Sequence, residues 1–266
     1  MLKVAPAFEP KTPAQGREAL PIPVRGALHV HSTLSHDGTL TIPELVAWYR
    51  KYGYRFIALG EHAQDMDEDK VRILEQQSAE CSTSDFCVIP GLEFACKGGL
   101  HIVGLGMTSL LDVVEPVAVI QAIHAKKGYA ILAHPKRNGW NCPLHVSELI
   151  DAAEIWNVGY DGKFLPSPQS LAGFPKLRQA NPKLLAVAGQ DFHRASGFYD
   201  VGIEMAVSSL SPESILRNLH HGRYTIRARH FSCDSKAAFS MLESARLRVV
   251  SWQLGKLRQL RTVVSG

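Results

Sequence analysis

The chain has 266 residues, of which 45% are hydrophobic and 20% are charged. This composition is typical of a globular protein and excludes a disordered or fibrous chain. No apolar run reaches the roughly 18 to 20 residues of a membrane-spanning helix, and the N-terminus lacks the pattern of a secretory signal, so we expect a cytoplasmic protein. Residues 236–266 carry six basic residues and one acidic residue, which leaves the rest of the chain near neutral. A basic nucleic-acid-binding surface across the whole domain is therefore not favoured.

Three regions are expected along the chain. Residues 1–25 contain five prolines without a sustained period, which indicates an N-terminal extension outside the fold.

In the second region, residues 26–232, short apolar runs alternate with helical segments. Strands are expected at 26–31, 55–62, 86–94, 100–106, 128–135, 152–157, 184–193, 202–207 and 222–226. Helices are expected at 43–54, 67–81 and 116–127, in a stretch ending near 180, and from 211. This alternation predicts a mostly parallel sheet that is buried on both faces.

The third region, residues 233–266, is a basic tail. Its apolar residues recur at spacings of three to five, with arginine and lysine between them, which predicts an amphipathic helix. The recurring apolar residues are Leu242, Leu247, Val250, Leu254, Leu257 and Leu260. We expect this helix to pack on the main domain or on a partner subunit, although a basic amphipathic helix can also contact an anionic membrane.

Two histidines end the first expected strand. His29 and His31 are two residues apart, and strand side chains alternate between faces, so both imidazoles can reach one metal ion. The pair alone is a weak signal, because short motifs of this kind often arise by chance. The five cysteines contain no C-x-x-C pair, which argues against a disulfide framework and a thiolate zinc site.

Further residues of metal-ligand type lie at the edges of the other apolar strands. They are Glu61, His62, Glu93, His101, His134, Asp191 and His193. In a barrel of strand-helix units the strand ends meet at one rim, where active sites are built, so we expect these side chains to converge. Asp37 adds a carboxylate in the loop SHDG, where Gly38 marks a turn that aims it back at the site. The neighbouring His36 is the alternative candidate for the site residue of this loop.

These residues stand in segments that resemble the ordered motifs of a known family. The segments are HVHSTLSHDGTLTIPEL, IALGEH, GLEF followed by GGLHIVGLG, AHPKR and GQDFH. Together they are similar to the motifs of the PHP (polymerase and histidinol phosphatase) superfamily of metal-dependent phosphoesterases, over residues 26 to 224. The resemblance implies an α/β fold, a distorted seven-stranded β/α (TIM-like) barrel of the PHP type, over residues 26–232.

The resemblance also implies two or three divalent metal ions at the rim of the barrel. The implied ligands are His29, His31, Asp37, His62, Glu93, His101, His134, Asp191 and His193. Glu93 and Asp191 are expected as the bridging or shared carboxylates. Glu61 stands where the family more often has aspartate before the histidine, and we place it with the catalytic residues in a supporting position. Nitrogen and oxygen ligands suit Mn, Zn or Fe, and the sequence does not choose among them.

Such a site predicts hydrolysis of a phosphate ester. Metal ions lower the pKa of a bridging water and clamp the phosphoryl oxygens of a small phosphorylated substrate. Arg137 follows His134 by three residues, so its guanidinium is placed to contact the phosphate as a catalytic residue, and Lys136 is a weaker candidate. A solvated arginine is the plainer alternative. Asn157 and Lys163 are expected to line the substrate pocket.

The sequence favours cleavage of a phosphate monoester of a small metabolite or nucleotide. A phosphodiesterase or an exonuclease acting on nucleic-acid ends is the alternative within the enzyme class, and it would need aromatic side chains that stack bases. Trp140, Trp156, Phe164 and Phe198 are candidates, although aromatic residues near strand ends more often belong to the core. A non-catalytic metal-binding regulatory module is the alternative from another class, and it is disfavoured because every ligand position is filled.

Overall fold

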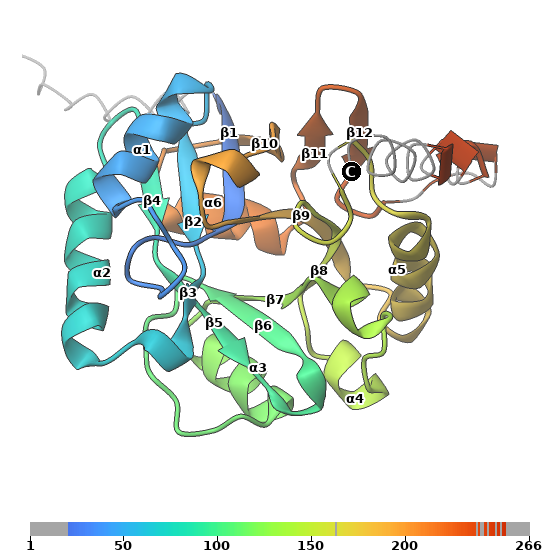
Figure 1. The fold of residues 1–266 in the computed structure, drawn as a ribbon, viewed down its shortest axis with the longest axis horizontal. Coiled ribbons are helices and arrows are strands. Elements are labelled where there is room, and N and C mark those ends of the chain that lie inside the picture. Colours follow the sequence, from blue (N-terminus) through green and yellow to red (C-terminus); the bar gives the residue numbers. More distant parts are fainter. Residues whose placement is uncertain are drawn as a thin grey trace, which may run out of the picture.

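A computed structural model of the chain describes residues 21–162, 164–237, 239, 242–243, 245–247, 249–250 and 252–253. Twelve strands form one mixed sheet, with helices around it (Figure 1). The strands are β1 (Ile22–Val30), β2 (Phe56–Leu59), β3 (Glu61–His62), β4 (Cys87–Ile89), β5 (Gly91–Ala95), β6 (His101–Leu105), β7 (Tyr129–Ala133), β8 (Ala152–Asn157), β9 (Leu185–Phe192), β10 (Val201–Val207), β11 (Thr225–Ala228) and β12 (Phe231–Asp234). The helices are α1 (Ile42–Lys51), α2 (Glu68–Cys81), α3 (Pro116–Ala125), α4 (Leu144–Ser147), α5 (Pro168–Ala180) and α6 (Pro212–His220).

Four of the described helices begin at side chains that cap their free N–H groups. Thr41 and Glu44 form a reciprocal capping box at the start of α1, and Asp67, Ser167 and Ser211 each accept a backbone N–H at the start of α2, α5 and α6. The sequence predicted these helices at nearly these positions, and the end of α1 falls three residues before the expected one.

The strand count differs from the expected seven for two reasons. Strands β10, β11 and β12 form an antiparallel extension beside β1. In addition, Gly60 alone separates β2 from β3, and Pro90 alone separates β4 from β5. Strand β1 is the most connected strand, because it pairs with β2 and β9 in parallel and with β10 antiparallel.

The prediction of a mostly parallel sheet was wrong for β6 and for β10 to β12. Strand β6 runs antiparallel to both β5 and β7. Only residues 96–100 join β5 to β6, and a parallel crossover needs a dozen residues or more. The start of β6 therefore lies beside the end of β5, with His101 opposite Ala95 on one side and Ala133 on the other.

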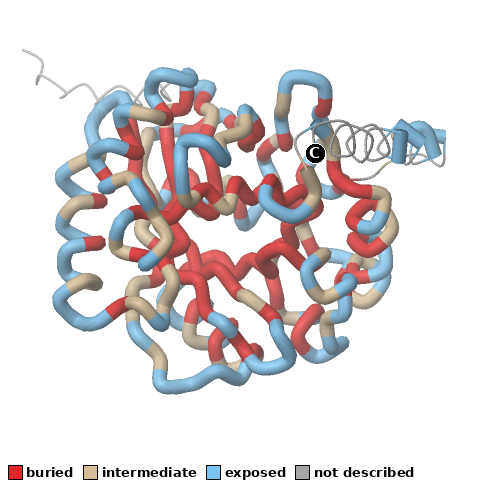
Figure 2. The backbone as a smooth tube through the Cα atoms, in the orientation of Figure 1, coloured by how far each residue is buried: buried red, intermediate tan, exposed pale blue. Residues whose placement is uncertain are grey.

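Buried residues follow the strands, while the helices and loops around them carry most of the exposed positions (Figure 2). Every residue of β7 and of β8 is buried, as expected for strands covered on both faces. The largest fully buried side chains include Trp156, Tyr49 and Tyr54. This packing makes the strands a rigid support for the side chains at their ends.

The ends of the chain lie largely outside the described residues. Residues 1–20 of the expected extension are among these, and β1 begins at Ile22, four residues before the expected start of the first strand. The expected tail begins within β12, and most of its amphipathic helix lies outside the described residues and stays a prediction. Among the helices that the structure describes, none is long and apolar enough to cross a membrane.

Gly26 leaves room for the buried Phe56 ring across the β1 and β2 pair. A Cβ atom at residue 26 would lie 2.1 Å from Phe56 Cζ. We expect Gly26→Ala to lower the free energy of unfolding by about 1 to 3 kcal/mol, as overpacking does, measured by urea denaturation. Gly197→Ala is the matched control, because nothing lies within 4 Å of its Cβ position, and it should change stability by less than about 0.5 kcal/mol. Equal stability of the two variants would contradict this account.

Candidate metal centre

A buried carboxylate, Glu93 in the middle of β5, lies among five histidines. Its Oε1 accepts hydrogen bonds from His101 Nδ1 at 2.8 Å and His134 Nε2 at 2.9 Å. Its Oε2 lies 3.1 Å from His62 Nδ1. The Nε2 atoms of His29 and His31 lie 3.4 and 3.7 Å from the same Oε2. Strands far apart in the sequence therefore bring these side chains to one point, as the sequence predicted.

Asp191 forms a second junction beside Glu93. Its Oδ1 lies 3.6 Å from Nε2 of both His29 and His31. The same oxygen is 3.8 Å from His193 Nδ1. Each of the two carboxylates expected to be shared is thus in contact with more than one histidine.

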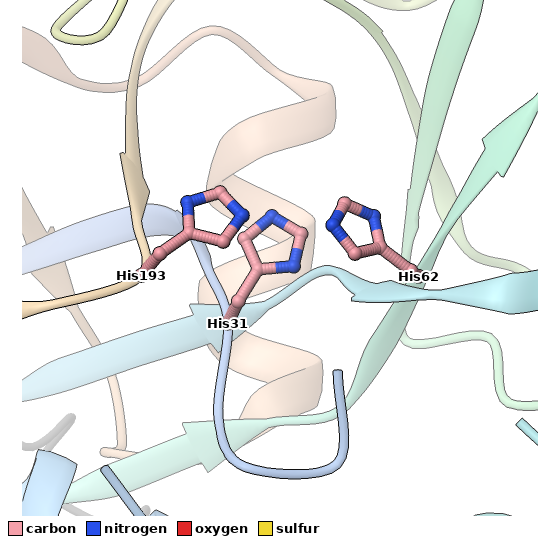
Figure 3. A group of neighbouring side chains, drawn as sticks. All are labelled: His31, His62 and His193. Carbon is pink, nitrogen blue, oxygen red and sulfur yellow. The ribbon is translucent and has the colours of Figure 1, made fainter. Parts of the chain in front are cut away.

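Asp37 lies at the outer side of this cluster. Its Oδ1 is 3.3 Å from His62 Nε2, and its Oδ2 is 3.3 Å from His193 Nε2. Figure 3 shows the His31 ring between the rings of His193 and His62. The His31 ring centroid lies 4.1 Å from that of His193 and 4.4 Å from that of His62. The turn after β1 therefore aims Asp37 back at the site, as expected.

The unpaired nitrogens of the cluster fit a set of divalent cations. Four groups of three side chains have ligand atoms within 4.8 Å of one another. They are His31, His62 and His193; His29, Glu93 and His134; His29, His31 and Asp191; and His36, Asp37 and His62. Nε2 of His29, His31 and His193 is buried and lacks a hydrogen-bond partner within the described part of the chain. Buried polar atoms are normally satisfied, so these nitrogens point to an absent ligand, and a metal ion bound by histidine nitrogen at about 2.0 to 2.1 Å suits them.

The two shared carboxylates stay ionised, which suits cations. Burial acts to raise the pKa of Glu93, but the charge of His29 and the hydrogen bonds from His101 and His134 hold it well below its usual range. The pKa of Asp191 is also lowered, since the nearby imidazoles outweigh its burial. Burial lowers the pKa of His31 to about 4, which keeps its ring neutral and able to ligate.

The backbone is strained at three of these positions. His29, His134 and Asp191 have φ values of 61°, 29° and 49°, in a region that non-glycine residues rarely occupy. The pairing register of β1 also shifts between Leu28 and Val30. His31 directly follows β1, so this irregularity at His29, and not the simple strand alternation that the sequence suggested, brings the two ring centroids to 5.0 Å from each other. Strain of this kind clusters at functional sites.

Glu154 in β8 is a site residue that the sequence analysis missed. Its Oε1 lies 2.8 Å from His29 Nδ1, and its Oε2 accepts hydrogen bonds from the backbone N–H of His134 and from Asn157 Nδ2, both at 2.7 Å. Gly189 of β9 leaves the space that this carboxylate occupies, since a Cβ there would lie 1.8 Å from Oε1. The sequence does contain a signal for this residue, because a glutamate in the middle of the apolar run AAEIWN must be buried and therefore needs partners.

Glu61 faces the loop after β1. Its Oε1 accepts the backbone N–H of Ser32 at 2.9 Å, and its Oε2 accepts the Ser35 hydroxyl at 2.5 Å. The same Ser35 oxygen accepts the backbone N–H of His62 at 3.0 Å and lies 3.4 Å from His31 Nδ1. Burial raises the pKa of Glu61 despite these hydrogen bonds. Glu61 therefore supports the segments that carry His31, Asp37 and His62.

Arg137 reaches the edge of the cluster. Its Nη1 lies 2.6 Å from His101 Nε2, so a proton donor and an imidazole meet there. Lys136 instead donates to the Tyr160 carbonyl at 2.6 Å. Asn157, expected in the substrate pocket, is fully buried and holds Glu154, and Lys163 lies outside the described residues.

We expect Glu154→Gln to weaken metal binding. Both carboxylate oxygens of Glu154 accept hydrogen bonds, Oε1 at His29 Nδ1 and Oε2 at the N–H groups of His134 and Asn157. A glutamine side chain has an NH₂ group in place of one of these oxygens, so it cannot accept on both sides. Loss of such an orienting partner typically lowers metal affinity about 10- to 100-fold, which titration of chelator-treated protein would measure. Glu148→Gln, at an exposed position after α4, should keep the wild-type affinity. Equal affinities for the two variants would show that Glu154 does not hold the centre.

No family model and no curated protein matches the chain. Among solved structures, it is similar to a two-domain protein from Bacteroides vulgatus ATCC 8482 containing a predicted PHP-like metal-dependent phosphoesterase, at 16% identity over 81% of this chain and 69% of that chain, with a TM-score of 0.56. It also matches PsfC from Pseudomonas syringae PB-5123, at 14% identity over 86% of this chain and 96% of that chain, with a TM-score of 0.48. The fold assignment rests on the Bacteroides protein. In its fold, the chain resembles this protein that contains a predicted PHP-like metal-dependent phosphoesterase.

Proposed function

We propose that this protein is a metal-dependent phosphoesterase of the PHP superfamily that hydrolyses a phosphate monoester of a small metabolite or nucleotide. The observation that carries the proposal is the contact of one buried carboxylate, Glu93, with five histidines. The unpartnered ring nitrogens beside it add support, because buried imidazole nitrogens without a hydrogen-bond partner are suited to ligate metal ions.

The proposal includes a barrel of seven strands. Treating β2 with β3, and β4 with β5, as single strands interrupted at Gly60 and Pro90 gives a ring of pairings. The ring runs from β1 through β2/β3, β4/β5, β6, β7, β8 and β9 back to β1. Such a ring is consistent with the inward convergence of the strand ends.

We assign the ligands to three cation positions. His29, His31 and Asp191 hold the first, with Glu93 shared. Glu93, His101 and His134 hold the second. Asp37, His62 and His193 hold the third. His101 is the least secured of these ligands, because its Nδ1 faces Glu93 and its Nε2 faces Arg137.

Divalent ions in these positions would supply a water of lowered pKa and a positive charge for the phosphoryl oxygens. The chain contributes the geometry around them. The ionised carboxylates of Glu93 and Asp191 hold the histidines together, and Glu154 fixes the ring of His29. Arg137 donates from the edge of the cluster, where it can bind a phosphate oxygen.

The described aromatic residues give little support to the nucleic-acid alternative. Trp140 and Trp156 are buried in the core, and neither can stack a base. Phe164 is exposed and Phe198 is half-buried, in a group of rings that includes Tyr52 and Tyr199. Two of the four candidates are thus excluded as stacking residues, and the monoester remains the substrate class that we propose.

The first test is elemental analysis followed by hydrolysis of p-nitrophenyl phosphate and bis-p-nitrophenyl phosphate. We expect two or three divalent ions per chain, hydrolysis mainly of the monoester, and loss of that activity on treatment with a chelator. His29→Ala and Asp191→Ala should each remove metal and activity together, since both side chains belong to the first position. Metal without hydrolysis of either ester would favour the regulatory module, and preference for the diester would favour the phosphodiesterase.

Arg137→Ala should separate substrate binding from metal binding. A hydrogen bond to a charged group contributes about 1.5 to 3 kcal/mol, so we expect KM for the monoester to rise about tenfold or more. Bound metal should stay at the wild-type content. Arg72→Ala, on the exposed surface of α2, is the control and should keep the wild-type KM. Unchanged kinetics in Arg137→Ala would show that Arg137 has no role in substrate binding, as expected for a solvated arginine.

A further inference from the structure

One group of ligand-type side chains extends beyond the centre described above. His36, Asp37 and His62 bring one ligand atom each within 4.8 Å of one another. Asp37 and His62 also contribute to the third position, whose other histidine is His193. His36 is the one member of the outer group that the resemblance does not assign to a metal.

His36 is held by a carboxylate in the way that metal-binding histidines usually are. Its Nδ1 lies 2.7 Å from Asp65 Oδ2, and its backbone N–H donates to the same oxygen at 3.0 Å. Asp65 lies in the short helical turn directly after His62, so one segment holds the ring and supplies a neighbouring ligand. With Nδ1 occupied by the carboxylate, Nε2 is left as the ligating nitrogen, as in carboxylate-histidine-metal arrangements.

The histidines form a path from solvent to the buried centre. The side chain of His36 is 66% exposed, that of His62 is 13% exposed and that of His31 is fully buried. The ring centroids of His36 and His62 are 5.5 Å apart, and those of His62 and His31 are 4.4 Å apart. Asp37 lies beside His62 with 37% of its side chain exposed. A cation held at His36 is therefore in contact with solvent and with ligands of the inner position at once.

We propose that His36, Asp37 and His62 form an outer binding position for a divalent cation, with Asp65 orienting His36. This inference rests on the proposed metal centre. Because the outer and third positions share Asp37 and His62, one cation occupies one or the other. When His36 replaces His193 as a ligand, the ion moves outward while Asp37 and His62 stay bound to it. The outer position is thus the route by which the third ion enters and leaves.

The test uses the full chain, stripped with a chelator and reloaded with Co²⁺, whose absorption reports its ligands. Release of bound Co²⁺ to an added chelator gives the exchange rate of the weakest ion. The variants are His36→Ala, Asp65→Asn, His193→Ala and the double variant His36→Ala with His193→Ala. His230→Ala, an exposed histidine on the turn between β11 and β12, is the matched control. Circular dichroism confirms that each variant is folded.

We expect His36→Ala to bind as many ions as the wild type at saturation but to exchange the weakest one about tenfold or more slowly, a change of the size that metal-site partners produce. Asp65→Asn should slow exchange in the same direction. His193→Ala should keep a weakly bound ion at the outer position, and the double variant should lose that ion.

Two results would overturn the outer position while leaving the proposed function intact. One is wild-type exchange in both His36→Ala and Asp65→Asn. The other is equal ion content in His193→Ala and in the double variant. Failure of the wild-type protein to bind Co²⁺ would instead overturn the metal centre, and the outer position with it.

Discussion

The burial of Glu93 among five histidines constrains much of the rest of the molecule. An ionised carboxylate is costly to bury unless charged or hydrogen-bonding groups surround it, and here imidazoles from four other strand ends do so. Those imidazoles must in turn be oriented, which requires Glu154 beneath His29 and a glycine at position 189 to make room for it. The sheet, the bulge in β1 and the loop after it all serve to bring these groups to one point.

The sequence predicted the convergence because most of the ligand-type residues stand at or near the edge of an apolar strand, which is a local pattern. It did not predict the direction of β6, which depends on the short link at residues 96–100, or the bulge at His29, which depends on pairing with two neighbouring strands. Glu154 escaped notice because a single acidic residue in an apolar run acquires its meaning only from the strand packed against it. The role of a side chain that is set by contacts between distant segments cannot be predicted from local sequence patterns.

Support around the centre is divided between its two sides. Glu154 holds His29 and the backbone of His134 from the β8 side, and Glu61 holds the loop of Ser32 and Ser35 from the β3 side. The first support is entirely buried among rigid strands, whereas the second anchors a loop that reaches the exposed His36. This division suits a centre with one part fixed in the core and another part open to solvent.

The left-handed backbone at His29, His134 and Asp191 has a consequence for the stability of the fold. Each of these residues costs conformational energy that its chemistry alone justifies, since a glycine would adopt the same φ without strain. Glycine at any of the three positions would relieve the strain and at the same time remove a ligand-type side chain, so the stability of the fold and the composition of the centre are coupled there.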